Sequence, residues 1–292
     1  MAFEVVVVGG GFGGLTVAAL LAARGVNVCL IEKESRPGGC ASTVEKFGYS
    51  FETGVSMYTS WGAGEIHERV FSELRLDPPE VRPLSPAYVV RLPDGTDFPI
   101  SANREEFDAN LAEAFPECFD IARAFYLELE ATGDALRRVL VRVPDLPTAS
   151  RTRRLAALGP ELRNATRLLT NVTHTVEQHL VGASNRFRRF VDVQLQTFGQ
   201  CESKDCAFLY AAVALTAPLR GMYDIVGGAG ALADSLVESI RKAGGTVRFD
   251  TNVLRAVLDA EGNATGVDLL SGERIDATRA VISNLTVWDT YG

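Results

Sequence analysis

The stretch FEVVVVGGGFGGL, residues 3–15, decides the fold of this chain. Four consecutive valines predict a buried β-strand, because β-branched side chains favour extended backbone and the run carries no charge. The glycines that follow have separate roles. Gly9 permits a tight turn, Gly11 lets another molecule approach the backbone, and Gly14 lets the next helix pack closely on the strand. The stretch therefore predicts a strand, a glycine-rich turn and a helix.

An acidic residue ends the second predicted strand. Residues 26–31, VNVCLI, lead directly into Glu32, about 20 residues beyond the turn, where a carboxylate accepts hydrogen bonds from a ribose. The helix N-terminus offers unpaired N–H groups to phosphates. The sequence therefore predicts a dinucleotide site that includes Gly9, Gly11, Phe12, Gly13, Gly14 and Glu32. The alternative is an ordinary glycine-rich turn.

The residues after Glu32 favour a flavin over a nicotinamide cofactor. Residues 33–43 read KESRPGGCAST, so a second glycine pair closely follows the acidic residue. Simple nicotinamide domains usually continue directly into a helix at this point. A plain NAD-dependent dehydrogenase is therefore the weaker alternative.

From this point the chain resembles the FAD-dependent amine oxidase and phytoene desaturase superfamily. Residues 47–57, FGYSFETGVSM, look like its hairpin G-Y-x-F-D-x-G, with Glu52 where aspartate is usual. The resemblance implies FAD as cofactor, held after Glu32 by a basic segment, glycines and small residues: Lys33, Arg36, Gly38, Gly39, Cys40, Ala41, Ser42, Thr43, Val55, Ser56 and Met57. We expect Cys40 to be a packed thiol without a redox role.

The C-terminal part agrees with this resemblance. Residues 223–232, YDIVGGAGAL, open a helix that ends at a glycine pair, and short strands with glycine turns follow over 246–277 as a β-meander. Residues 280–284, AVISN, predict a separate strand buried in the main sheet. Carotenoid desaturases and isomerases carry this pattern. The resemblance implies that the Val253 backbone contacts the adenine and that Asn284 lies near the flavin.

The fold class that these segments predict is α/β. We expect a Rossmann-like FAD-binding domain of the glutathione reductase type, with a β-meander and an inserted, mainly helical substrate domain. The expected boundaries are 1–75 and 221–292 for the FAD-binding domain and 76–220 for the insertion. Relatives in this family continue further, so we expect a fragment, a truncated protein or one half of a split enzyme. A partner chain would then supply the C-terminal part of the family fold.

The bulk composition fits a globular protein. The chain has 292 residues, 47% of them hydrophobic, and a formal net charge of −8. Five cysteines without a C-x-x-C motif, and a first strand that begins at Phe3 with no charged leader, predict a cytoplasmic location. His174 and His179 are five residues apart, which does not place two ligands on one helix face, so no metal is expected.

The middle of the chain is basic, although the whole chain is acidic. Eleven arginines lie between Arg137 and Arg189, opposed by Asp145, Glu161 and Glu177. Apolar residues at nearly helical spacing accompany them, so the region predicts peripheral contact with an anionic membrane; the alternative is a solvated face on the domain core. Nucleic acid is a poorer explanation, because base-stacking aromatic residues are missing. The uncharged run 207–219 is too short to span a bilayer and predicts a core helix or the lining of a substrate tunnel.

These features predict an FAD-dependent oxidoreductase of the carotenoid desaturase or isomerase type, acting on a long apolar polyene. No residues have the spacing of a catalytic acid–base pair, and many flavin enzymes need none, so no catalytic residue is assigned. Two alternatives remain: an enzyme similar to amine or protoporphyrinogen oxidases, and a truncated, non-catalytic FAD-domain protein.

Overall fold

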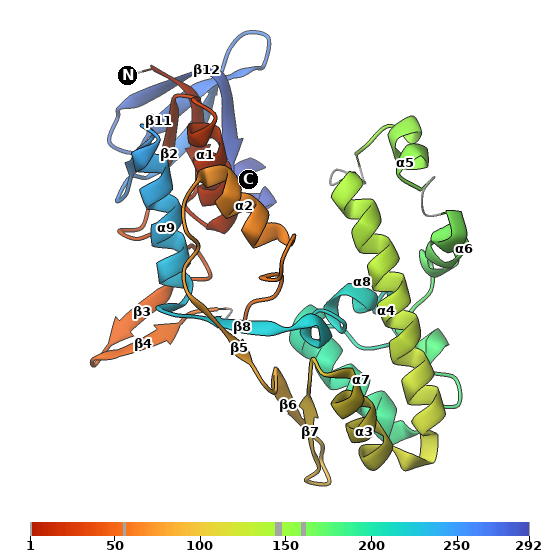
Figure 1. Cartoon of the computed structure of the whole chain (residues 1–292). Helices are drawn as coiled ribbons and strands as arrows, with labels where there is room; N and C mark the ends of the chain where they lie inside the picture. Colours follow the sequence, from red (N-terminus) through yellow and green to blue (C-terminus); the bar gives the residue numbers. More distant parts are fainter. Residues whose placement is uncertain (1, 55–56, 144–147, 159–161, 292) are drawn as a thin grey trace. The chain divides into compact units, whose positions relative to one another are not determined.

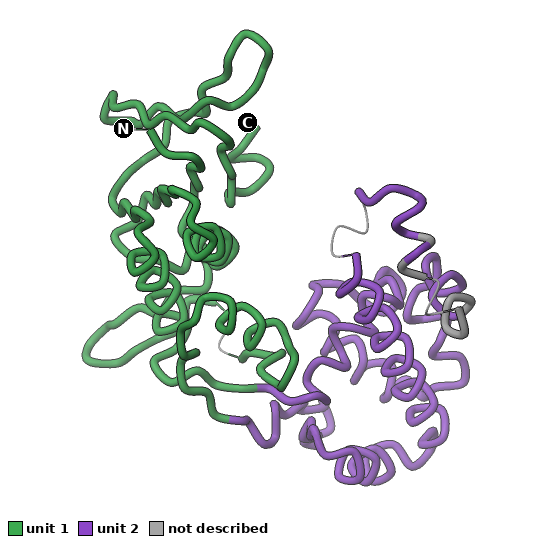
Figure 2. Tube along the Cα trace, turned by 45° about the horizontal axis from the view of Figure 1, so that its top comes forward, with its two compact units in different colours: residues 1–82, 223–292 green, residues 83–222 purple. Residues whose placement is uncertain are grey.

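The computed structural model describes residues 2–54, 57–143, 148–158 and 162–291. The chain forms two compact units, drawn in different colours in Figure 2. Unit 1 contains Met1–Arg82 and Tyr223–Gly292, and unit 2 contains the intervening Pro83–Met222. One unit is therefore inserted into the sequence of the other, and the two strands β5 (Val81–Leu84) and β8 (Met222–Ile225) pair where the chain passes between them.

A six-stranded sheet with the order β10-β11-β12-β1-β2-β9 organises unit 1 (Figure 1). Its parallel part consists of β1 (Ala2–Val8), β2 (Val28–Ile31), β9 (Thr246–Arg248) and β12 (Arg274–Ser283). β10 (Val253–Leu258) and β11 (Ala264–Leu269) continue the sheet as antiparallel strands. The predicted α/β class with a Rossmann-like sheet and a meander is confirmed.

Strand β12 differs from the expectation of two separate strands over 273–277 and 280–284. It is continuous: it pairs with β11 in antiparallel fashion from Arg274 to Asp276 and with β1 in parallel from Asp276 to Ser283. The pairing register of β1 with β12 shifts between Phe3 and Val5, so the irregularity in the ladder lies at this point of β1. Ile282 lies in the main sheet as predicted, but its side chain is only half-buried.

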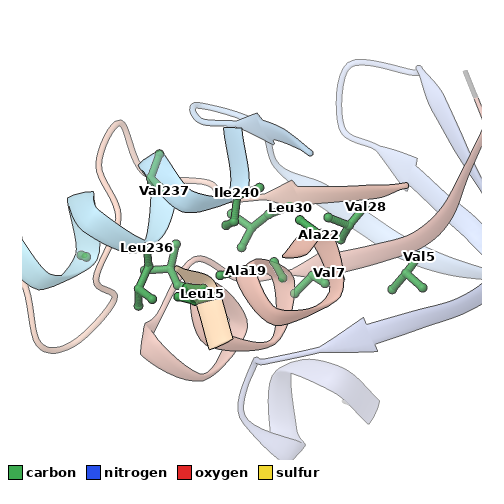
Figure 3. Close-up of a cluster of buried hydrophobic side chains, with 13 residues drawn as sticks. Val5, Val7, Leu15, Ala19, Ala22, Val28, Leu30, Leu236, Val237 and Ile240 are labelled. Atoms are coloured by element: carbon green, nitrogen blue, oxygen red, sulfur yellow. The ribbon is translucent and has the colours of Figure 1, made fainter. Parts of the chain in front are cut away.

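Two helices cover one face of the sheet, as Figure 3 shows. Helix α1 (Phe12–Ala23) contributes Leu15 and Ala19, and helix α9 (Gly228–Lys242) contributes Leu236 and Ile240. Side chains alternate along β1: Val5 and Val7 join this core, whereas Val6 and Val8 pack on the opposite face with residues of β11 and β12. Both faces of β1 are buried, which explains its unbroken valine run.

A hairpin and one helix complete unit 1. The hairpin pairs β3 (Thr43–Lys46) with β4 (Tyr49–Glu52), and helix α2 spans Ile66–Leu74. Glu52 accepts a hydrogen bond from the Ala229 N–H at 3.2 Å and one from the Thr43 hydroxyl at 2.7 Å. The carboxylate therefore caps the first turn of α9, and a side chain at Gly228 would collide with it.

Unit 2 begins with a hairpin and continues mainly as helices. An aromatic core holds it together, with ring centroids of Phe98 and Phe190 4.6 Å apart and those of Phe115 and Phe187 5.2 Å apart. The elements are β6 (Tyr88–Arg91), β7 (Asp97–Ile100), α3 (Arg104–Ala114), η1 (Pro116–Cys118), α4 (Phe119–Arg142), α5 (Arg151–Leu158), α6 (Leu162–Asn171), η3 (Val176–His179), α7 (Asn185–Gly199), α8 (Phe208–Ala214) and η4 (Pro218–Arg220).

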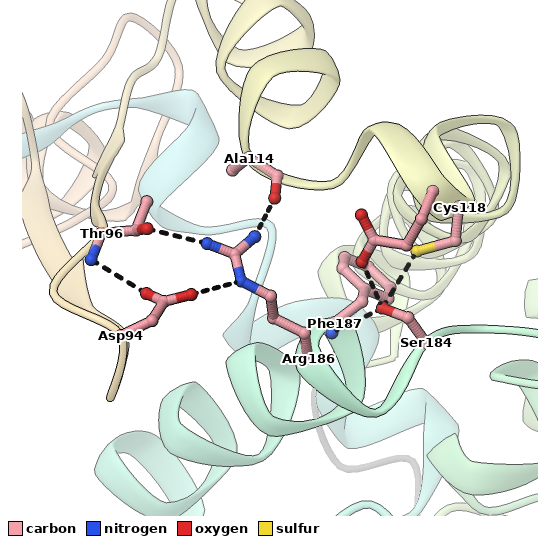
Figure 4. A network of polar contacts seen from close by, with 8 residues as sticks. Asp94, Thr96, Ala114, Cys118, Ser184, Arg186 and Phe187 are labelled. Carbon is pink, nitrogen blue, oxygen red and sulfur yellow. Dashed lines mark hydrogen bonds and ion pairs between the residues drawn. The ribbon is translucent and has the colours of Figure 1, made fainter.

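Part of the arginine-rich region has a structural role. Arg186 on α7 donates to Asp94 at 2.7 Å, to the Thr96 hydroxyl at 2.8 Å and to the Ala114 carbonyl, as Figure 4 shows. It thereby fixes the β6–β7 turn and the end of α3 to α7. The guanidinium of Arg186 holds the pKa of the Asp94 carboxyl well below its usual range.

The apolar run 207–219 forms α8 and the start of η4. Phe208, Ala211 and Ala212 are buried, while Tyr210 is exposed, so the segment is a packed helix of unit 2. Within the described ranges, none of the helices combines the length and the apolar character needed to cross a bilayer.

Candidate functional site

A cleft with a volume of about 680 Å³ opens at the carboxyl ends of the parallel strands in unit 1. Its walls come from the turns after β1 and β2, the glycine loop over residues 36–42, the segment before β10 and the residues after β12. Ligands of open α/β sheets bind at this edge. The volume lies within the range of about 300–1,000 Å³ that is typical of small-molecule sites.

Two glycine loops pack against each other in the wall of the cleft. The Gly38 N–H donates to the Gly10 carbonyl at 2.8 Å, and a bridge pairs Gly11 with Gly38. A Cβ atom at Gly39 would lie 3.1 Å from the Cα of Gly11. Side chains would separate these loops, so the second glycine pair is needed to bring bare backbone up to the first turn.

Glu32 is buried at the end of β2 and is held by backbone groups. One carboxylate oxygen accepts from the Gly10 N–H, and the other accepts from the Glu34 N–H at 2.9 Å. A carboxylate has about four acceptor positions, so capacity remains for ribose hydroxyls. Glu32 therefore holds the glycine turn in place and presents an acceptor to the cleft.

The segment before β10 is fastened to the residues after β2. The Thr251 N–H donates to the Glu32 carbonyl at 3.0 Å, and the Asp250 N–H donates to the Glu34 carbonyl at 3.1 Å. These bonds place Val253 and its neighbours on the same rim as Glu32. Residues more than 200 positions apart in the sequence thus form one wall.

Of the nineteen residues predicted to bind the cofactor, thirteen line the cleft: Gly9, Gly11, Phe12, Glu32, Lys33, Arg36, Gly38, Gly39, Cys40, Ala41, Ser42, Val253 and Asn284. Four lie elsewhere: Gly13, Gly14, Thr43 and Met57. Val55 and Ser56 are outside the described residues.

Three of those four residues have other contacts. A Cβ at Gly14 would collide with the Gly9 carbonyl, so Gly14 lets α1 approach the turn. A Cβ at Gly13 would collide with the Asn284 side chain. The Thr43 hydroxyl accepts from the Gly230 N–H at 2.8 Å and belongs to the cap of α9.

Asn284 covers the glycine turn more closely than the sequence suggested. Its backbone N–H donates to the Val8 carbonyl at 2.8 Å, and its carboxamide occupies the space beside Gly11 and Gly13. The sequence analysis missed the cleft residues Val8, Ile31, Glu34, Pro37, Thr251, Asn252, Leu285, Thr286 and Asp289. A parallel pairing of β12 with β1 brings the carboxyl ends of both strands to the same edge of the sheet. Knowledge of this pairing would have indicated that the residues after Asn284 line the cleft.

Cys40 departs from its expected role as a packed thiol. It is exposed and lines the cleft, directly after Gly38 and Gly39, which both have positive φ angles. Its carbonyl, in contrast, is fixed by the Thr53 hydroxyl at 3.1 Å.

The charges of the cleft suit a dinucleotide. Helix α1 starts from Gly11 without a side-chain cap and has no acidic residue in its first turn, so its N-terminus carries a partial positive charge that favours an anion. Lys33 and Arg36 provide cations, and Glu32 provides a ribose acceptor. The residues present therefore fit an adenine dinucleotide, with the diphosphate at the turn.

The fold and the cleft define a dinucleotide-binding protein of the Rossmann type. The family described as NAD(P)-binding Rossmann-like domain matches residues 7–74, which contain both glycine loops and Glu32. A putrescine oxidase structure is similar over 97% of this chain and 58% of its own, with a TM-score of 0.64 and 16% identity. This likeness supports the architecture.

The chain is similar in sequence to enzymes named for polyene substrates. It is 27% identical to human all-trans-retinol 13,14-reductase and 28% identical to prolycopene isomerase 1 of an Oncidium hybrid cultivar, in each case over 99% of this chain. The chain spans about half the length of these relatives, 48% and 49%. The predicted resemblance to the carotenoid desaturase and isomerase family is confirmed, and together with the cleft it supports FAD as the cofactor.

Proposed function

We propose that this chain is the FAD-binding part of an oxidoreductase that desaturates, saturates or isomerises a long apolar polyene. The observation that carries the proposal is the combination of a dinucleotide cleft with similarity along 99% of the chain to a retinol reductase and a prolycopene isomerase. When bound, FAD would supply the two-electron redox chemistry.

The residues of the cleft would bind and orient the cofactor. In this proposal the Glu32 carboxylate accepts the adenine ribose hydroxyls, and the Val253 backbone contacts the adenine. The bare amides after Gly9 receive the diphosphate, with Arg36 as counter-charge. Asn284 lies toward the flavin, and the inserted, mainly helical segment 76–220 forms the substrate domain.

Incubation of the FAD-loaded chain with prolycopene, phytoene and all-trans-retinol tests this proposal. Chromatography would detect an isomer, a desaturated product or a saturated product, the last after reduction of the flavin. Conversion of one polyene supports the proposal. Oxidation of putrescine without change in any polyene would favour the amine oxidase alternative. FAD binding without turnover of either class, also after addition of the second half described below, would favour the non-catalytic one.

The chain spans about half the length of these relatives, and the proposal includes a requirement for the sequence that corresponds to their other half, supplied by the same protein or by a partner chain. Turnover by the chain alone would remove the need for such a partner. Turnover that appears only after addition of a separately expressed second half would support it.

We also propose that the Arg137–Arg189 region makes peripheral contact with an anionic membrane. Arg151, Arg153 and Arg154 are exposed on α5, and Leu169 on the next helix, α6, is 63% exposed. A polyene dissolves in lipid, so contact with a bilayer would give access to it. Sedimentation with phosphatidylserine vesicles, but not with phosphatidylcholine vesicles, is the expected result; equal recovery in both supernatants would contradict it.

A further inference from the structure

The β3–β4 hairpin of unit 1 exposes three aromatic side chains within five residues. Phe47 is 87% exposed, Tyr49 is 70% exposed and Phe51 is 52% exposed. The ring centroids of Tyr49 and Phe51 lie 6.5 Å apart, and the Lys46 Nζ atom lies 5.4 Å from the centroid of the Phe47 ring. The hairpin therefore presents an aromatic patch to solvent, with a cation at its tip.

The pairing register separates the aromatic side chains of the hairpin from its carboxylates. Side chains alternate along a strand, and residues that pair directly across two strands share a face. One face carries the pairs Val44–Phe51 and Lys46–Tyr49. The opposite face carries the pairs Thr43–Glu52 and Glu45–Ser50. The charged side chain on the aromatic face is thus a lysine, whereas both glutamates of the hairpin lie on the other face.

The polar face fastens the hairpin to unit 1. Glu52 accepts a hydrogen bond from the Ala229 N–H at 3.2 Å, and the Thr43 hydroxyl accepts one from the Gly230 N–H at 2.8 Å. Both bonds hold the base of the hairpin at the start of α9, from which the hairpin extends away in Figure 1. The aromatic face is therefore carried on a fixed support.

The turn of the hairpin has an unfavourable residue at its tip. Phe47 and Gly48 are the two turn residues, with φ angles of 54° and 77°. Turns of this kind favour asparagine, aspartate or glycine at the first position, because a bulky side chain is strained at positive φ. The exposed ring gains no burial in return. The fold does not explain a phenylalanine here, which indicates a ligand that covers the ring.

We propose that the tip of this hairpin inserts into the headgroup region of an anionic lipid bilayer. Aromatic rings and lysine stems suit this boundary, because their apolar parts leave water while their polar ends stay hydrated. Lys46 complements anionic headgroups, and the hairpin carboxylates lie on the opposite face. The contact belongs to unit 1 and depends neither on the Arg137–Arg189 region nor on the polyene substrate.

Tryptophan fluorescence at the tip provides a test specific to this contact. The chain has two tryptophans, Trp61 and Trp288. In a Trp288→Phe background, Phe47→Trp reports on the tip, and Leu258→Trp is the matched control at an exposed apolar position of the β10–β11 hairpin. Vesicles of phosphatidylserine and brominated phosphatidylcholine should shift the emission of Phe47→Trp to the blue and quench it, relative to the Trp288→Phe parent. They should leave Leu258→Trp unchanged.

A second variant separates a lipid contact from a structural role. Phe47→Asn should raise Tm, because asparagine suits this turn. It should also weaken binding to the same vesicles about tenfold, because the ring no longer leaves water. A lower Tm with unchanged vesicle affinity would assign Phe47 to the fold and overturn the proposal.

Three fluorescence results would also overturn it. Emission at position 47 that is not quenched excludes insertion of the tip, even if the chain sediments with phosphatidylserine vesicles through its arginine-rich region. Equal quenching at positions 47 and 258 would show unspecific adsorption. Emission at position 47 that is blue-shifted before vesicles are added would show that protein covers the ring, and a shift that grows with protein concentration would identify that protein as a second copy of the chain.

Discussion

Replacement of Glu32 by alanine tests the site most sharply, because this carboxylate connects the fold to the ligand. The substitution leaves the Gly10 and Glu34 N–H groups without their acceptor. Hydrogen bonds to a charged group contribute about 1.5–3 kcal/mol each, and water can replace the acceptor for the partly buried Glu34 N–H. We therefore expect a loss of about 2–4 kcal/mol in the free energy of unfolding, measured by urea denaturation.

The same substitution should weaken cofactor binding. Loss of one hydrogen bond between ribose and carboxylate, at about 1.5–3 kcal/mol, corresponds to a decrease in FAD affinity of roughly 10- to 100-fold. Glu45→Ala, an exposed substitution on β3 with the same change in charge, is the control and should alter neither quantity. A folded Glu32→Ala protein that binds FAD within about twofold of the wild type would refute this reasoning.

Three further predictions concern stability. Asp94→Asn should make Tm fall less steeply as the pH drops below about 4. Arg186 lowers the pKa of Asp94 in the folded protein from its usual 3.8, so the ion pair stabilises the fold above that pH. This stability is lost as the pH falls, because the unfolded chain takes up the proton first. Parallel calorimetric curves for variant and wild type would contradict this. Glu52→Ala should cost about 1 kcal/mol in urea denaturation, because α9 loses its cap; an unchanged midpoint would argue against the capping role. Gly133→Ala should cost about 1–3 kcal/mol, because its methyl group would lie 2.5 Å from a carbonyl of α8; thermal melts with an unchanged Tm would show that the helices separate without penalty.

Local sequence signals predicted the first half of the site well. The glycine turn, the second strand and Glu32 lie within one β-α-β unit, where spacing alone determines which residues meet. The sequence predicted Gly39 as a cofactor-binding residue, and it lines the cleft, but its close approach to the Cα of Gly11 is seen only in the structure.

Contacts between distant segments could not be predicted in the same way. Strand β12 pairs first with β11 and then with β1. Its sequence reads as two strands because the polar residues Thr278 and Arg279 interrupt it. Glu52 lies on the β3–β4 hairpin and accepts a hydrogen bond from Ala229 at the start of α9, 177 residues further along the chain. No local pattern in the sequence indicates this contact. Gly13 resembles a phosphate contact in the sequence, whereas in the structure it faces the Asn284 carboxamide.

Titration of the purified chain with FAD and with NAD tests the central claim most directly. We predict saturable binding of one FAD per chain, seen as quenched flavin fluorescence, and much weaker binding of NAD. Absence of saturable FAD binding at excess cofactor, or equal affinity for the two dinucleotides, would contradict the claim that this cleft is built for a flavin.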